Sequence, residues 1–199
     1  MENLAPKVAS RVMRELAELT NEKSAVDGVS VFLPSESNLC DIHAKMVGPQ
    51  GTPFEGGISH LRLALSRDFP HEAPKGYFLT KIFHPNVSPT GEICVNTLKK
   101  DWSPELGLKH VLTVIKCLLI DPNPESAFNE DAGKLLLEDY AQFAQTARIW
   151  TDVYAEAAER PAESAASADG VPGSSMPGDG KPKPSDASSK SKKKSLKRL

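Results

Sequence analysis

The sequence predicts an α+β fold in which an N-terminal helix leads into a four-stranded antiparallel meander, followed by C-terminal helices and a disordered tail. Three successive patterns support this prediction. Apolar residues recur at helical spacing over residues 6–20, alternate with polar residues in segments between 29 and 83, and return to helical spacing after residue 110. Helical and strand patterns that stay separate along the chain are typical of α+β proteins.

The first helix is predicted at residues 6–20. Pro6 suits a first helical turn, because the N–H that proline lacks has no partner there. One face of this helix is expected to be buried, and it carries Val8, Val12, Leu16 and Leu19.

Four strands are predicted next, because short runs of alternating apolar and polar residues are separated by Gly and Pro-rich connections. In the second run, Cys40, Ile42, Ala44 and Met46 alternate with polar residues, and Gly and Pro dominate the connection that follows it at 48–57. Antiparallel pairing is expected from such a succession. The four predicted strands cover residues 29–33, 39–47, 58–66 and 77–83.

Helices are predicted at residues 110–120, 129–137 and 139–158. The first is apolar on most sides and is expected to be buried, with Cys117 as a core thiol. Pro122 and Pro124 end it, because proline cannot continue a helix.

The chain divides by composition into a domain at 1–158 and a basic tail at 159–199. From about residue 161 it is dominated by Ala, Ser, Gly, Pro and Lys, which cannot bury enough apolar surface to offset the entropy of ordering. The net charge of the whole chain is −2, yet residues 161–199 hold eight basic and four acidic residues. The domain is therefore acidic, so nucleic-acid binding by it is not expected.

Several classes of protein are excluded by the cysteines and by hydropathy. The three cysteines, Cys40, Cys94 and Cys117, have no regular spacing, so neither a disulfide framework nor a metal site is expected. An intracellular, reducing location fits this usage. The N-terminus has no signal-peptide pattern, and no apolar run approaches the ~20 residues of a membrane span.

Cys94 is the strongest candidate for chemistry, and the residues alone leave two interpretations open. It follows a Pro-Thr-Gly turn, which favours a surface position, but a lone cysteine is most often a packed thiol. A protease-like arrangement would require His84 or His110 to meet Asn86 and Cys94 in space.

The string His84-Pro85-Asn86, followed after seven residues by Cys94, is the active-site signature of ubiquitin-conjugating enzymes, which this sequence resembles over about residues 4–155. The segments PKGYFLTKIFHPNV and GEICVN and the basic C-terminus are most similar to the S-type branch of that family. Further family segments follow in the expected order: Arg14-Glu15-Leu16, the loops at 48–57 and 69–74, Trp102-Ser103-Pro104 and Asp121–Pro124.

The resemblance implies an enzyme, an acyltransferase that accepts ubiquitin on Cys94 as a thioester and passes it to a lysine amine. No cofactor is expected to be bound, because ATP is consumed upstream by the activating enzyme. Exchange between a thiol and a thioester is nearly balanced, so a well-placed thiol of ordinary acidity needs no histidine base.

The loop residues then receive separate roles. Asn86 is expected either to donate to the oxyanion that forms when an amine attacks the thioester, or to hold the loop before Cys94 by bonding to backbone. His84 is expected to bond within the loop, and Pro85 and Trp102 to support it.

The acceptor lysine must lose a proton, because its ordinary pKa is about 10.4. Many relatives carry an acid just after the Pro-Asn-Pro segment, but this chain has Ser126 there. Glu130 and Asp131 are the nearest candidates for the missing acid. Their alternative role is that of helix N-terminal acids favoured by the helix dipole.

Partner binding is implied at both ends of the chain. Lys7, Arg11 and Arg14 of the first helix would face the activating enzyme, although they also fit a solvated helix surface. Family members that bind RING-type ligases have apolar and small residues at two loop tips, where this chain has His71 and Glu105. Weak docking through those loops is therefore expected.

The tail is expected to replace that docking, because a flexible segment of this length reaches about 35 Å. The S-type resemblance implies that its end binds a multi-subunit ligase like the anaphase-promoting complex, with elongation of polyubiquitin chains, cell-cycle and cell-division roles, and a nuclear and cytoplasmic location. The alternative is a solvated basic run that serves nuclear import or nucleic-acid contact. The expected docking residues are Leu196, Lys197, Arg198 and Leu199.

Two other functions stay open at this point. One is a non-catalytic interaction module with the same fold, and the other is a carrier of a different ubiquitin-like modifier. The presence of Cys94 favours a carrier over the module, but the residues do not identify the modifier.

Overall fold

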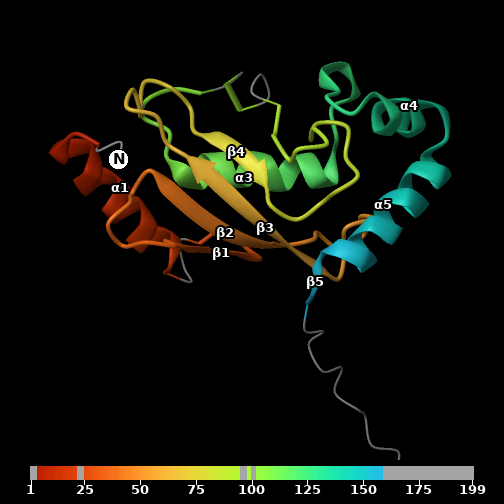
Figure 1. The fold of residues 1–199 in the computed structure, drawn as a ribbon, viewed down its shortest axis with the longest axis horizontal. Helices are drawn as coiled ribbons and strands as arrows, with labels where there is room; N and C mark the ends of the chain where they lie inside the picture. The colour runs from red at the N-terminus through yellow and green to blue at the C-terminus, as the bar shows by residue number, and fades with distance from the viewer. Residues whose placement is uncertain (1–3, 22–24, 95–97, 100–101, 159–199) are drawn as a thin grey trace, which may run out of the picture. The chain divides into compact units, whose positions relative to one another are not determined.

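The computed structural model describes residues 4–21, 25–94, 98–99 and 102–158 (Figure 1). The order of its elements confirms the α+β prediction: a helix, an antiparallel sheet, then further helices. The elements are α1 (Pro6–Leu19), β1 (Val29–Phe32), β2 (Asp41–Val47), β3 (Gly57–Ala64), β4 (Lys75–Phe78), α3 (Leu108–Ile120), the 3-10 helix η1 (Pro124–Ser126), α4 (Glu130–Glu138), α5 (Tyr140–Tyr154) and β5 (Glu156–Ala157).

The sheet is the predicted meander, with strand order β1-β2-β3-β4 and every pair antiparallel. Its register follows the hydrophobic alternation, since Ile42 lies opposite Leu63 and Ala44 opposite Leu61. These four side chains are at most 1 % exposed. A one-residue slip would turn all of them to solvent, so the burial pattern fixes the pairing.

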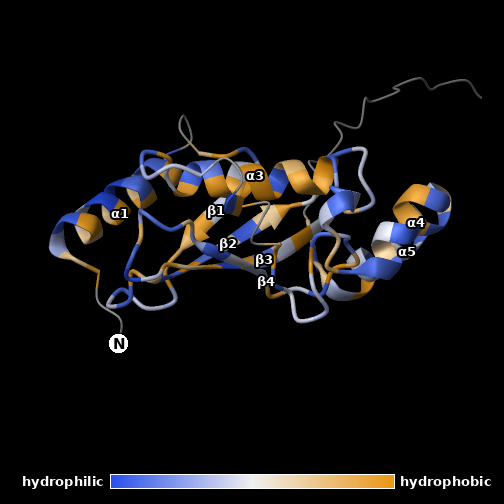
Figure 2. Cartoon of the chain, turned by 90° about the horizontal axis from the view of Figure 1, so that it is seen from above, coloured by the Kyte–Doolittle hydropathy of each residue, from blue (hydrophilic) through white to orange (hydrophobic). Residues whose placement is uncertain are grey.

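Helix α3 lies along the sheet, is largely hydrophobic and supplies six buried residues, whereas α1 is largely hydrophilic (Figures 1 and 2). The prediction that this helix is buried on most sides was wrong in one respect. Cys117 is exposed, and so is Ile120, because both lie on the face of α3 turned away from the core.

Strand β4 ends at Phe78, whereas the sequence predicted a strand over 77–83. Leu79 is exposed, and its N–H donates to the carbonyl of His60 at the strand end. Ile82 and Phe83 are buried instead, and the Phe83 ring packs near Phe143 and Trp150 of α5. These hydrophobic residues pack against a helix and do not form a strand, and the periodicity of a short apolar run cannot tell these two cases apart.

The last predicted helix, 139–158, is also shorter than expected. Helix α5 stops at Tyr154, and β5 pairs with the start of β3. The Glu156 carboxylate lies 3.0 Å from His60 Nε2 and 3.1 Å from Lys45 Nζ. The pKa of Glu156 is lowered mainly by the hydrogen bond with His60 and next by the bond with Lys45. Contacts with a sheet distant in sequence therefore override local helix propensity.

Candidate functional site

The loop that carries Cys94 is held against β4 by backbone hydrogen bonds. The Cys94 N–H donates to the Asn86 carbonyl at 3.0 Å, and the Ile93 N–H donates to the Gly76 carbonyl at 2.9 Å. An isolated β-bridge also joins Tyr77 and Glu92. The segment 84–94 is thus a closed loop whose two ends meet at Cys94.

Gly91 lets that loop lie against the strand. Its φ is +88°, a conformation that side chains rarely adopt, and a Cβ built on it would lie 2.1 Å from the Phe78 carbonyl oxygen. The Phe78 N–H in turn donates to the Gly91 carbonyl at 2.7 Å. The Pro-Thr-Gly turn in the sequence is therefore required for the placement of Cys94.

Cys94 is buried, with 2 % of its surface exposed. The expectation that the preceding turn places it at the surface is wrong, because the loop folds over β4 and pairs with it. Cys40 is half-buried and Cys117 exposed.

His84 is fully buried and both of its ring nitrogens are used. Nε2 lies 2.8 Å from the Leu118 carbonyl, which can only accept, so Nε2 carries the proton. Nδ1 accepts from the Asn86 N–H at 3.0 Å. Burial lowers the pKa of His84 to about 4. His84 is a neutral structural residue here and has no ring nitrogen free to act as a base on Cys94.

This burial predicts a stability change with pH. Between pH 4 and 6.5 the unfolded chain protonates His84 and the folded chain does not, so stability rises with pH through that window and is fully present above it. His84→Gln is expected to remove about 3 kcal/mol of this pH dependence.

The measurement is the free energy of unfolding by denaturant at pH 4 and pH 7 for both proteins. Carboxylates titrate in this range in both, so the comparison uses the difference between the two slopes. Equal slopes would show that His84 is not the titrating group.

The Asn86 side chain joins two loops. Its Nδ2 donates to the carbonyls of Asn123 at 2.6 Å and Ser126 at 3.0 Å, and its Oδ1 accepts from the Asn123 N–H at 2.8 Å. Asn86 is 0 % exposed. Both amide protons are therefore committed to holding the 123–126 segment, and an oxyanion would have to replace one of those carbonyls.

The acceptor-side candidates lie on the segment that Asn86 holds and on the helix after it. Ser126 is half-buried at the end of η1, while Glu130 and Asp131 are exposed in the first turn of α4. Helix α4 is tied to the loop of Cys94, because the Asn129 N–H donates to the Pro85 carbonyl at 3.0 Å. The acids thus occupy the positions that the helix dipole favours.

Trp102 anchors a neighbouring loop. Its indole N–H donates to the Pro70 carbonyl at 3.0 Å, and its ring centroid lies 6.1 Å from that of Phe69. The structure thus places Trp102 against the loop that bears His71 at its exposed tip, and its predicted support of the loop of Cys94 stays a prediction.

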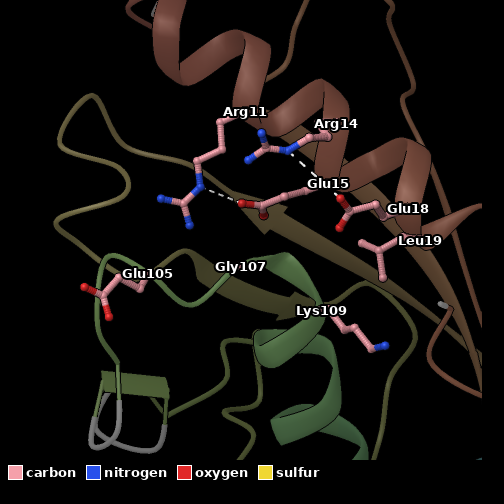
Figure 3. A pocket seen from close by; sticks show the side chains of 8 residues that line it. All are labelled: Arg11, Arg14, Glu15, Glu18, Leu19, Glu105, Gly107 and Lys109. Carbon is pink, nitrogen blue, oxygen red and sulfur yellow. Dashed lines mark hydrogen bonds and ion pairs between the residues drawn. The ribbon is translucent and has the colours of Figure 1, made fainter.

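The three predicted docking cations of α1 differ in their surroundings, and Figure 3 shows two of them, Arg11 and Arg14. Lys7 is exposed, and Arg14 has 71 % of its side chain exposed. Arg11 has 24 % exposed and bonds to Glu15 and to the backbone of the segment before α3. Sequence reasoning missed this ion pair, although the i, i+4 spacing of Arg11 and Glu15 was a signal for it.

The predicted tail, with Leu196, Lys197, Arg198 and Leu199, lies outside the described residues, as does most of the segment between Cys94 and Trp102. In the described part of the chain, no group of His, Cys, Asp and Glu residues is arranged to hold a metal ion. None of the described helices is long and apolar enough to cross a membrane.

Comparison with protein families finds a match over residues 11–151 to the family described as "Ubiquitin-conjugating enzyme". Among curated proteins, the chain is 55 % identical over 170 residues to "Ubiquitin-conjugating enzyme E2 S" of Drosophila ananassae, covering 85 % of this chain and 78 % of that protein. It is 54 % identical over 156 residues to "Ubiquitin-conjugating enzyme E2 S-B" of Xenopus laevis, covering 78 % of this chain and 72 % of that protein.

The fold is also similar to solved structures. A ubiquitin conjugating enzyme E2 domain from Toxoplasma gondii superposes with a TM-score of 0.66 at 36 % identity, covering 74 % of this chain and 98 % of that one.

Proposed function

Because this chain belongs to the ubiquitin-conjugating enzyme family, we propose that it builds polyubiquitin chains together with a multi-subunit ligase that binds its C-terminal tail. The activity itself is that of a ubiquitin carrier, a transferase that forms a thioester on a cysteine. Its partners are ubiquitin, the ubiquitin-activating enzyme and ubiquitin ligases.

The thioester forms on Cys94. The Cys94 sulfur attacks the carbonyl of the thioester on the activating enzyme, and the thiol of that enzyme leaves. ATP is spent before this step, so this chain needs no bound cofactor. No base from His84 takes part, because both nitrogens of that ring are occupied.

The second step is attack by a lysine amine on the Cys94 thioester. An isopeptide bond forms, the bond to sulfur breaks, and the thiol is released. The observation that carries this proposal is the position of Asn86, which bonds to Cys94 through its backbone and to the Asn123 and Ser126 carbonyls through its side chain. One residue thus connects the thioester site to the segment that faces the acceptor.

The proton of the acceptor lysine must pass to a base, such as a carboxylate, which Ser126 does not provide. Glu130 and Asp131 of α4 supply that carboxylate in this proposal, or the acceptor ubiquitin brings its own. The bond between the Asn129 N–H and the Pro85 carbonyl keeps the start of α4 next to the loop of Cys94.

Chain elongation with a ligase resembling the anaphase-promoting complex is the finer part of the proposal, and with it a cell-cycle role in nucleus and cytoplasm. It is supported by the similarity to proteins named E2 S and by the basic C-terminus ending in Leu196-Lys197-Arg198-Leu199. A tether of this kind raises the effective concentration of the domain at its ligase.

Deleting Ser195–Leu199 is expected to leave the charging of Cys94 unchanged and to slow ligase-dependent chain extension by about 100-fold, as expected when a tether is lost. The assay compares both rates for full-length and truncated chains, and mass spectrometry of the products identifies the linkage.

A matched control replaces Lys193 and Lys194 by alanine, which removes two positive side chains, as the deletion does, and leaves the terminal leucines. Equal extension by the truncated and full-length chains would refute docking, and an equal defect in the control would assign the effect to charge alone.

A further inference from the structure

Arg11 and Glu15 form an ion pair that closes one side of the groove between α1 and the segment 105–109 (Figure 3). Arg11 Nε lies 2.6 Å from Glu15 Oε1. Only 24 % of the Arg11 side chain and 12 % of the Glu15 side chain are exposed. A pair this far from solvent is less screened than a surface pair on the same helix, such as Arg14 and Glu18 at 4.0 Å.

The remaining donors of Arg11 bind the backbone of the segment before α3. Nη1 donates to the Pro104 carbonyl at 2.5 Å, and Nη2 donates to the Leu106 carbonyl at 2.9 Å. The guanidinium thus uses all three of its nitrogens within the protein. These two carbonyls flank Glu105, the exposed tip of the segment.

Glu15 completes the connection by capping α3. Its second oxygen, Oε2, accepts from the Leu108 N–H at 2.8 Å. The residue before the helix, Gly107, has no side chain to do this, and a Cβ there would lie 2.7 Å from the same Glu15 oxygen. Helix α3 is therefore capped by a residue of α1 that lies far away in sequence.

We infer that Arg11 and Glu15 are positioning residues, which fix the 104–107 segment and the start of α3 against α1. This inference rests on the proposed docking of α1 to the activating enzyme. It assigns direct contact with that partner to Lys7 and Arg14, and it gives Arg11 the separate task of setting the shape of the docking surface.

The alternative is that Arg11 docks through its charge, and an Arg→Lys change separates the two. Lysine keeps the charge but not the planar fork that binds one carboxylate and two carbonyls together. A positioning residue fails when the fork is lost, whereas a docking cation tolerates the change. Glu15→Gln makes the opposite test, because it removes a negative charge and would help a docking cation.

The experiment measures Cys94 charging by the ubiquitin-activating enzyme as its rate against the concentration of this protein. Arg11→Lys and Glu15→Gln are each expected to raise the KM about tenfold with an unchanged kcat, as expected for the loss of one charge-assisted hydrogen bond. Arg62→Lys is the matched control, because Arg62 of β3 also pairs with a carboxylate at 2.6 Å, that of Asp41, but lies outside α1 and the 104–109 segment; it is expected to change the KM less than twofold. A wild-type KM for Arg11→Lys, or a lowered KM for Glu15→Gln, would overturn the inference.

A second measurement does not depend on activity. Hydrogen exchange at the Leu108 amide is expected to accelerate about tenfold in Arg11→Lys and Glu15→Gln and to stay unchanged in Arg14→Lys. If the wild-type protein accepts no ubiquitin, the proposed function fails, but this readout still tests whether Arg11 and Glu15 position the start of α3. If exchange at Leu108 is unchanged in the two variants, that positioning role is refuted, whatever the charging assay shows.

Discussion

Replacing Cys94 by alanine is expected to abolish the reductant-sensitive ubiquitin adduct completely. In the proposed function the thioester forms on the Cys94 sulfur, and the methyl group of alanine cannot replace that nucleophile. The measurement is a gel without reductant after incubation with activating enzyme, ATP and ubiquitin. Since Cys94 is buried in a closed loop, alanine should fit there, and the fold should be retained.

Two kinds of control make this result specific. Cys40→Ala and Cys117→Ala should charge normally, because neither thiol lies in the loop that Asn86 closes. Cys94→Ser should give an adduct that resists reductant, because an oxyester replaces the thioester. Any reductant-sensitive adduct on Cys94→Ala would place the site on another cysteine.

The same assay tests which modifier is carried. Charging with several ubiquitin-like proteins and their activating enzymes, side by side, should favour ubiquitin. Preference for another modifier would contradict the proposed function without affecting the assignment of Cys94.

The predictable part of the fold was the part set by local periodicity. Helix α1 and strand β2 were located from the sequence because each places one apolar stripe against the core, as Val12 and Ile42 do at 0 % and 1 % exposure. The family motif located the loop of Cys94 as well, since Gly91 and the Pro-Thr-Gly turn are local signals.

The errors arose where contacts distant in sequence decide the structure. Phe83 reads as a strand residue but packs on α5, and Glu156 reads as helical but is held by Lys45 and His60 of the sheet. Cys117 looked like core because its helix is apolar, yet it lies on the outer face. Spacing along a helix says which residues share a face and not which face meets the sheet.

The roles of polar residues were the hardest to predict, because hydrogen bonds to backbone leave no sequence pattern. Arg11 and Arg14 are alike in sequence, since each has a glutamate four residues later, but Arg11 also binds the carbonyls of Pro104 and Leu106. The partners of Asn86 at Asn123 and Ser126 are equally invisible in the sequence.

Asn86→Ala is the second change with a large expected effect. Charging of Cys94 should stay within about twofold of wild type, whereas transfer to a lysine should fall about 100-fold, the size of effect seen when one preorganised donor is lost. Stability should also fall, by about 1–3 kcal/mol for each buried partner left unsatisfied. Single-turnover discharge to lysine and thermal unfolding measure the two effects.

The matched control is Asn129→Ala, which removes the side-chain cap of α4 at the Ala132 N–H and costs about 1 kcal/mol. It leaves the Asn86 bonds intact, so its discharge should remain close to that of wild type. Equal discharge defects in both variants would mean that lost stability alone is responsible, and wild-type discharge by Asn86→Ala would remove Asn86 from the reaction.

Small nucleophiles then separate the two roles of Asn86. The structure commits both amide protons to the carbonyls of Asn123 and Ser126, which favours a role in positioning the acceptor-side segment. Hydroxylamine needs no such segment, so its reaction with charged Asn86→Ala should be nearly as fast as with wild type. If hydroxylamine and lysine slow equally, Asn86 instead stabilises the oxyanion, and one of its two carbonyl partners must be released during the reaction.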